Sequence, residues 1–187
     1  MRWRAMGGVA GPAAFVTAWS ILGARRAGYS PVHDPISRLA EVGSSTRPAM
    51  TGGFLAFGLG VAVYSTALRQ RMPGASIAAA TTALATAGVA AFPLGASMGD
   101  DPHAAAAGIA YASLVAIPAL GARTLGRQGH HAAARASVTI AVAAGSALVA
   151  STLTSSHTGL FQRLGLTVAD VWIVGSAIWL LRQDDRP

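Results

Sequence analysis

Cysteine and lysine are both absent from this sequence: all 14 of its basic residues are arginine. Without cysteine the chain can form neither a disulfide nor a thiol-dependent site, although this absence leaves the cellular compartment open. The use of arginine alone, together with abundant alanine and 22 glycines, is typical of a protein from a GC-rich bacterial genome.

Charged residues are also scarce. They make up 11% of the sequence, against 52% for hydrophobic residues, whereas a soluble domain needs roughly 25% charged residues. Six apolar windows are each long enough to cross a hydrocarbon core about 30 Å thick. These windows cover residues 5–24, 49–68, 74–98, 104–122, 136–156 and 164–181. We therefore predict an all-α, polytopic membrane bundle of six transmembrane helices, forming one domain over residues 1–187.

The net charge of +7 does not indicate a nucleic-acid partner, because the arginines fall at the ends of the apolar windows. Six spans place both termini on one side of the membrane. That side carries nine arginines and the opposite side carries five. Because loops rich in arginine stay in the cytoplasm, we predict cytoplasmic termini in a multi-pass protein of the bacterial plasma membrane.

The acidic residues are distributed unevenly between the two sides. Apart from the tail Asp184-Asp185, every Asp and Glu lies inside the membrane or in one of the three outer loops, 25–48, 99–103 and 157–163. Arginine, histidine and glutamine residues accompany the acids in these loops. Polar residues gathered on one side, from three separate loops, indicate a functional surface there.

Helix packing and helix starts can also be read from the sequence. Gly52-Gly53, Gly58 and Gly60 predict close packing in the second span, and Pro93 and Pro118 predict kinks in the third and fourth spans. Each of the outer Asp-Pro pairs has the form of a helix start, with Asp as the cap and Pro first in the helix. Asp101 would begin the fourth span. Asp34 would begin a short interfacial helix from Pro35 to about Val42, with Ile36, Leu39 and Val42 turned inward.

Asp170 lies within the last apolar window. An acid inside a bilayer is costly and normally faces the interior of the bundle. Helical spacing places Asp170 on one stripe with Arg163 and Thr167. Two interpretations follow: a buried pair with Arg163 that locks helices together, or an acid kept protonated by an apolar site for proton transfer.

Three histidines, one from each outer loop, allow a different chemistry. His33, His103 and His157 could together bind zinc and leave one position open for water, as in a metal hydrolase. However, no two of them have the i, i+4 spacing of a recognised zinc motif. Hydrogen bonding, proton transfer or substrate contact are the alternatives for these imidazoles.

Several segments resemble a known family, the small six-span prokaryotic proteins catalogued as domain of unknown function 998. The similar segments are Tyr29-Ser30, Asp34-Pro-Ile-Ser-Arg-Leu-Ala-Glu-Val-Gly43, Met50 to Gly60, Asp101-Pro-His103 and Gly159-Leu-Phe-Gln-Arg163. The resemblance covers almost the whole chain. It implies a six-helix membrane fold whose signature includes Asp34, Ser37, His103, Gln162 and Arg163. Similar membrane proteins include terpene cyclases.

Three functions are consistent with these observations. The first is a membrane enzyme using acid–base chemistry on an apolar isoprenoid or lipid substrate, most concretely proton-initiated terpenoid cyclisation. Its candidate catalytic residues are Asp34, Asp170, His103 and Arg163. Its candidate substrate-binding residues are Ser37, Arg38, Glu41, Asp100, Asp101, His157, Gln162 and Trp172. The second is a metal-dependent lipid hydrolase, and the third is a non-enzymatic lipid-binding or assembly protein. We expect no cofactor for the first function, and the three outer loops are expected to converge above Asp170.

Overall fold

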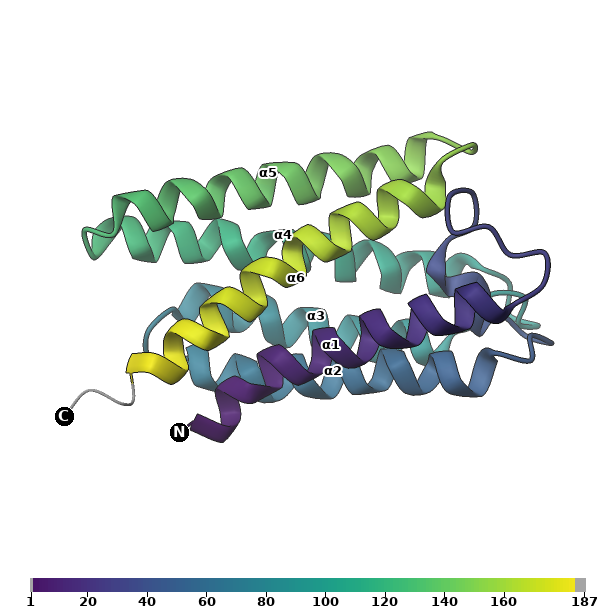
Figure 1. Ribbon diagram of the computed structural model, residues 1–187, viewed down its shortest axis with the longest axis horizontal. Helices are drawn as coiled ribbons and strands as arrows, with labels where there is room; N and C mark the ends of the chain where they lie inside the picture. The colour runs from purple at the N-terminus through teal and green to yellow at the C-terminus, as the bar shows by residue number, and fades with distance from the viewer. Residues whose placement is uncertain (1, 184–187) are drawn as a thin grey trace.

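A computed structural model describes residues 2–183, which form six long α-helices and one short 3₁₀ helix (Figure 1). No strand occurs among these residues. The elements are α1 (Arg2–Arg25), η1 (Ile36–Ala40), α2 (Arg47–Leu68), α3 (Pro73–Ala91), α4 (Asp101–Arg127), α5 (His131–Leu153) and α6 (Thr158–Gln183). All six α-helices are long and apolar enough to cross a membrane, as in a multi-pass membrane protein. The predicted fold class is confirmed.

The helices form a closed ring in which each packs against the next, and α6 returns to pack against α1. The start of α1 and the end of α6 lie at one end of the bundle (Figure 1). Loops 26–46, 92–100 and 154–157 lie at the other end, which we call the polar end. Of the six contacts around the ring, the one between α1 and α6 is the least extensive.

Glycines allow α1 and α2 to approach closely. A Cβ added to Gly60 would lie 2.6 Å from the Cα of Gly11 and 2.7 Å from the carbonyl oxygen of Gly7. Small residues serve this purpose in membrane bundles, where lipid provides no hydrophobic drive for helices to associate. The close packing predicted for the second span is therefore confirmed at Gly60. It does not extend to Gly52, which has open space where a side chain would begin.

All six helices begin earlier than the apolar windows predict, and α3 and α5 also end sooner. Helix α3 ends at Ala91, two residues before Pro93. This proline therefore lies beyond the helix and does not kink it. Pro118 lies inside α4, which continues through it. Because α4 begins at Asp101 and α6 at Thr158, His103, Gln162 and Arg163 belong to helical turns and not to loops.

The predicted interfacial helix is not confirmed. The chain forms only the five-residue η1, whose Ile36 and Leu39 are almost completely buried against the bundle. Val42, predicted to turn inward, is 45% exposed. Neither Asp-Pro pair caps a helix with its Asp side chain, because Pro35 and Asp100 hold the cap positions and no side-chain hydrogen bond is formed there.

Candidate functional site

Arg163 fastens the 26–46 loop to the first turns of α6. Its side chain is only 8% exposed, and one guanidinium nitrogen donates to the carbonyl oxygens of Pro31 at 2.7 Å and Asp34 at 3.1 Å. The other terminal nitrogen donates to the Tyr29 hydroxyl. The guanidinium carbon also lies 5.2 Å from the centre of the Trp19 ring, within cation–π range. Arg163 thus binds the loop backbone and not an acid.

Gln162, the preceding residue, joins η1 to α4. Its side-chain oxygen accepts a hydrogen bond of 2.7 Å from the backbone N–H of Ile36, and its side-chain nitrogen donates to the Tyr111 hydroxyl. Two residues earlier, the backbone N–H of Leu160 donates to the carbonyl oxygen of Val32 at 3.0 Å. The start of α6 therefore provides partners for backbone groups along the loop, among them the N–H of the buried Ile36.

Tyr29 remains a neutral phenol in this arrangement. Burial raises the pKa of its hydroxyl above the ordinary value, although the neighbouring Arg163 lowers it. The neutral hydroxyl accepts from Arg163 and is within reach of the carbonyl oxygens of Asp34 and Pro35. Tyr29 therefore extends the polar contacts of Arg163 across the loop.

Gly159 lets the loop lie directly against α6. A Cβ at this position would lie 2.3 Å from the carbonyl oxygen of Asp34 and 2.6 Å from that of Pro31. We expect Gly159→Ala to push the loop away and to lower the free energy of unfolding by roughly 1–3 kcal/mol. Thermal unfolding in detergent measures this. Gly52→Ala is the matched control, because nothing lies within 4 Å of its added Cβ. Equal melting temperatures for the two variants would contradict this packing.

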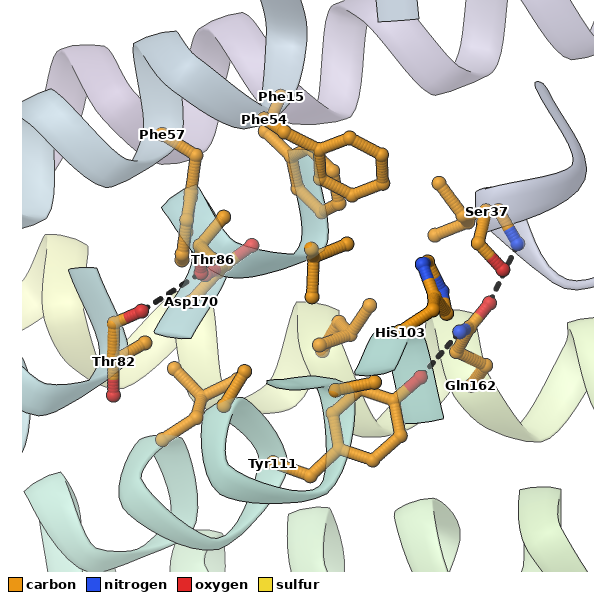
Figure 2. Close-up of a pocket in the computed structure, with 16 residues that line it drawn as sticks. Phe15, Ser37, Phe54, Phe57, Thr82, Thr86, His103, Tyr111, Gln162 and Asp170 are labelled. Atoms are coloured by element: carbon orange, nitrogen blue, oxygen red, sulfur yellow. Dashed lines mark hydrogen bonds between the residues drawn. The ribbon is translucent and has the colours of Figure 1, made fainter. Parts of the chain in front are cut away.

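Below the loop lies a cavity enclosed by η1 and by every long helix except α5 (Figure 2). Its polar lining residues are Ser37, Thr82, Thr86, His103, Gln162 and Asp170. Its aromatic lining residues are Phe15, Phe54, Phe57 and Tyr111. The cavity volume is about 50 Å³, which has room for roughly three to five water molecules.

Among residues 2–183, Asp170 is the only acid that lines this cavity. It is the thirteenth of the 26 residues of α6, about 18 Å along the helix from its first residue. Its side chain is 5% exposed, and neither carboxyl oxygen has a hydrogen-bond partner among residues 2–183. The predicted pair with Arg163 is wrong, because Arg163 turns toward the loop. With no cation or donor beside it, Asp170 occupies a site that tolerates the neutral carboxylic acid far better than the carboxylate.

His103 lines the same cavity at the polar end, across from Asp170 (Figure 2). Its Nδ1 lies 2.8 Å from the carbonyl oxygen of Phe92. A carbonyl oxygen only accepts hydrogen bonds, so Nδ1 carries the ring proton. In the neutral ring Nε2 is then the basic nitrogen. The cavity therefore combines an acid with no partner and an imidazole whose tautomer is fixed.

Aromatic rings form much of the cavity wall. Phe15 packs against Phe54 and Phe57, with ring centres 5.5 and 5.3 Å apart. Trp172, a predicted substrate-binding residue, does not line this cavity. Its ring fills the space beside Gly121, and its indole N–H donates to the Ser137 hydroxyl at 2.8 Å.

The other predicted site residues lie outside the cavity. Asp34 accepts a hydrogen bond of 2.8 Å from the backbone N–H of Ser30 and lies 3.7 Å from Arg38. Glu41 pairs with Arg26. Asp100 accepts from the backbone N–H of Gly95, and Asp101 and His157 are exposed. These side chains hold the loops in place or face outward. Of the outer residues expected to converge above Asp170, only Ser37, His103 and Gln162 line the cavity with it.

The three outer histidines do not form one site. His33 and His157 lie together at the surface, with ring centres 6.1 Å apart, while His103 is buried in the cavity. Among residues 2–183, no group of three or more His, Cys, Asp or Glu side chains could hold a metal ion. The structure does not support the tri-histidine zinc site.

Comparison with known families gives one match. Residues 9–179 match the family described as Protein of unknown function (DUF998). The chain belongs to this family. No curated protein and no solved structure matches the chain. The DUF998 resemblance expected from the sequence is therefore confirmed over almost the whole length.

Two of the DUF998-like segments contact each other in space. Gly159, Gln162 and Arg163 of one segment bind the 31–36 backbone, which contains the start of the other. These residues position the loop that covers the cavity, and of the three only Gln162 also lines the cavity.

Sequence reasoning missed several residues of the cavity wall. Helical spacing offered a signal, because Phe54 and Phe57 are three residues apart and Thr82 and Thr86 are four apart. Each pair therefore shares one helix face, and the two threonines are among the few polar positions of an alanine-rich stretch. Phe15 carries no comparable signal.

Proposed function

We propose that this DUF998 protein is a membrane enzyme that uses acid–base chemistry on an apolar isoprenoid or lipid substrate. Proton-initiated terpenoid cyclisation is the most concrete form of this proposal. The observation that carries it is Asp170: a carboxyl group with no hydrogen-bond partner among the described residues, buried at mid-helix in an aromatic-lined cavity. An acid kept neutral by an apolar site is suited to donate a proton.

The proposed reaction is an isomerisation and requires no cofactor. Asp170 donates its proton to an alkene or epoxide of the substrate, which becomes a carbocation. An internal double bond of the substrate attacks this cation and closes a ring. A proton then leaves a neighbouring carbon to the carboxylate of Asp170 or to Nε2 of His103. Atoms and charge balance, because one proton is given and one is taken back.

The cavity walls would support the charged intermediate. The faces of aromatic rings attract cations, and Phe15, Phe54 and Phe57 line the cavity together with Asp170. Once Asp170 has lost its proton, its negative charge also stabilises the cation at short range. In this proposal Arg163 is a positioning residue, because its contacts hold the covering loop.

A non-enzymatic lipid-binding protein is the second candidate. The central cavity of about 50 Å³ is far below the roughly 300–1,000 Å³ of typical ligand pockets. It cannot enclose a whole substrate during a reaction, whereas lipid binding requires only one polar group of the lipid at Asp170. Under this alternative Asp170 would bind a lipid group without transferring a proton.

Proton transfer from solvent distinguishes the two candidates. Purified protein in lipid nanodiscs would be incubated in D₂O with epoxidised isoprenoids, isoprenoid diphosphates or unsaturated acyl lipids. The proposal predicts a cyclised product carrying deuterium at the carbon that received the proton, because the carboxyl hydrogen of Asp170 exchanges with solvent between turnovers. Binding of these compounds without any deuterated product would favour the lipid-binding alternative.

The same proposal places the protein in the bacterial plasma membrane with its termini in the cytoplasm. Among residues 2–183, eight arginines lie toward the end that carries the start of α1 and the end of α6, and five lie toward the polar end; the arginine-rich side stays cytoplasmic. The catalytic cavity then lies nearer the outer face.

Single-cysteine labelling tests this orientation in the cysteine-free chain. In intact cells, Asp101→Cys and His157→Cys should react with a membrane-impermeant maleimide, because both positions are exposed at the polar end. Gln70→Cys and Gln128→Cys, exposed at the opposite end, should react only after the cells are opened. The reverse pattern would invert the proposed topology.

A further inference from the structure

A second hollow reaches Asp170 from outside the ring. We call it the α1–α6 groove; it runs between the two helices and is lined by Ala13 and Val16 of α1 and by Asp170, Val171, Val174 and Gly175 of α6, among others. Of the residues that the structure describes, Asp170 alone lines both this groove and the central cavity. The groove opens on the side of the bundle that would face lipid.

The two hollows differ about tenfold in size. The groove has a volume of about 540 Å³, against about 50 Å³ for the central cavity. A typical pocket for a small molecule has roughly 300–1,000 Å³. The groove is an open depression that can seat an apolar chain lying along the two helices, while the central cavity has room only for a few waters or for the reacting end of such a chain.

The polar end offers no comparable route to Asp170. Ile36 and Leu39 of η1 are almost completely buried there, and Gln162 and Arg163 fasten this part of the chain. Opening that route would break several buried hydrogen bonds at once. The contact between α1 and α6, in contrast, is the least extensive of the ring.

We propose that the α1–α6 groove binds an apolar chain from the bilayer and presents its proton-accepting group to Asp170. The groove is lined almost entirely by apolar side chains, and Asp170 is a carboxyl group 5% exposed with no hydrogen-bond partner among residues 2–183. Because the carboxyl oxygens are covered, α1 and α6 separate slightly when the chain binds. This inference rests on the proposed function for the identity of the reacting group, and it adds the route and the substrate class.

Labelling with carbodiimides tests the route without any enzyme assay. Dicyclohexylcarbodiimide is apolar and reacts with protonated carboxyl groups, so it should modify Asp170 from the lipid phase in protein held in nanodiscs. A water-soluble carbodiimide should modify the loop acids and leave Asp170 unmodified. Peptide mapping by mass spectrometry identifies the modified acid, and Asp170→Asn should remove the signal.

Two adjacent alanines of α1 give a matched pair of variants. Ala13→Phe fills the groove, whereas Ala14→Phe adds the same side chain at an exposed position outside it. We expect Ala13→Phe to slow dicyclohexylcarbodiimide labelling of Asp170 several-fold and Ala14→Phe to leave it unchanged. Gly175→Leu is a second filling variant, because nothing lies within 4 Å of a Cβ added there. Equal labelling in all three variants, or labelling of Asp170 by the water-soluble reagent, would overturn the proposal.

Protection experiments identify the chain type. Farnesol and dodecanol, added in turn to the nanodiscs, should slow labelling of Asp170 if they occupy the groove. Stronger protection by farnesol assigns an isoprenoid and stronger protection by dodecanol assigns an acyl chain; protection by neither overturns the proposed ligand. These results are independent of turnover. If the alcohols protect Asp170 but no deuterated product forms, the proposed enzyme activity is rejected and the groove is retained as a binding site. If a deuterated product forms but filling the groove does not affect it, the groove is rejected and the enzyme activity is retained.

Discussion

Asp170→Asn should abolish turnover and leave the protein folded. The amide has nearly the same shape as the carboxylic acid but cannot give up a proton. The carboxyl oxygens of Asp170 have no hydrogen-bond partner among the described residues, so the substitution breaks no existing hydrogen bond. General acid catalysis typically contributes a factor of about 10² to 10⁴. We therefore expect the rate of deuterated product formation to fall by at least about 10², with an unchanged melting temperature.

Asp34→Asn is the control for this result. Asp34 was the other acid predicted from the sequence, but it lies in the covering loop, where it accepts from the backbone N–H of Ser30. An amide oxygen can accept the same hydrogen bond, so Asp34→Asn should keep its turnover. Normal activity in Asp170→Asn, or equal losses in the two variants, would remove Asp170 from its role as the acid.

Arg163→Gln should cause the largest loss of stability of any substitution at the polar end. The guanidinium donates to the carbonyl oxygens of Pro31 and Asp34 and to the Tyr29 hydroxyl, and the shorter amide cannot reach them all. Hydrogen bonds to charged groups contribute about 1.5–3 kcal/mol each, and a buried carbonyl left without its donor adds a penalty. We expect the free energy of unfolding to fall by about 3 kcal/mol or more, measured by thermal unfolding in detergent.

Arg47→Gln makes the same change at an exposed arginine in the first turn of α2. This variant should melt within a degree or two of the original protein, because surface substitutions usually change stability by less than about 0.5 kcal/mol. Limited proteolysis adds a local measurement. Arg163→Gln should expose the 26–46 loop to cleavage, and Arg47→Gln should not. Equal melting and cleavage in both variants would show that Arg163 does not fasten the loop.

The helices were predictable from the sequence because their signal is local. Each span needs about 20 apolar residues, and all six windows overlap the helices observed. The errors are at the ends. Charged residues such as Asp101 and Arg163 lie outside the apolar windows but inside the helices. Helical backbone hydrogen bonds form whether the side chain is polar or apolar.

The cavity was only partly predictable. Polarity correctly selected Ser37, His103, Gln162 and Asp170 as residues that meet. The predicted pairing of Arg163 with Asp170 is wrong. Helical spacing shows that the two residues share one face of α6, but it does not show which other groups Arg163 can bind. Arg163 instead binds the backbone carbonyl oxygens of Pro31 and Asp34. The pattern of side chains in the sequence does not predict such backbone contacts. Phe15 was missed because an apolar residue in a span gives no sign of whether it faces lipid or a cavity.

The bonds that fasten the loop have a consequence for biosynthesis. Gln162 and Arg163 bind groups that lie 126 to 134 positions earlier in the chain. Membrane insertion during translation proceeds from α1 toward α6, so the loop leaves the ribosome long before its partners. Its backbone carbonyls stay hydrated until the last helix arrives. We therefore expect a chain stalled after five helices to be cleaved more readily in the 26–46 loop than the completed protein, because the contacts of Gln162 and Arg163 have not yet formed.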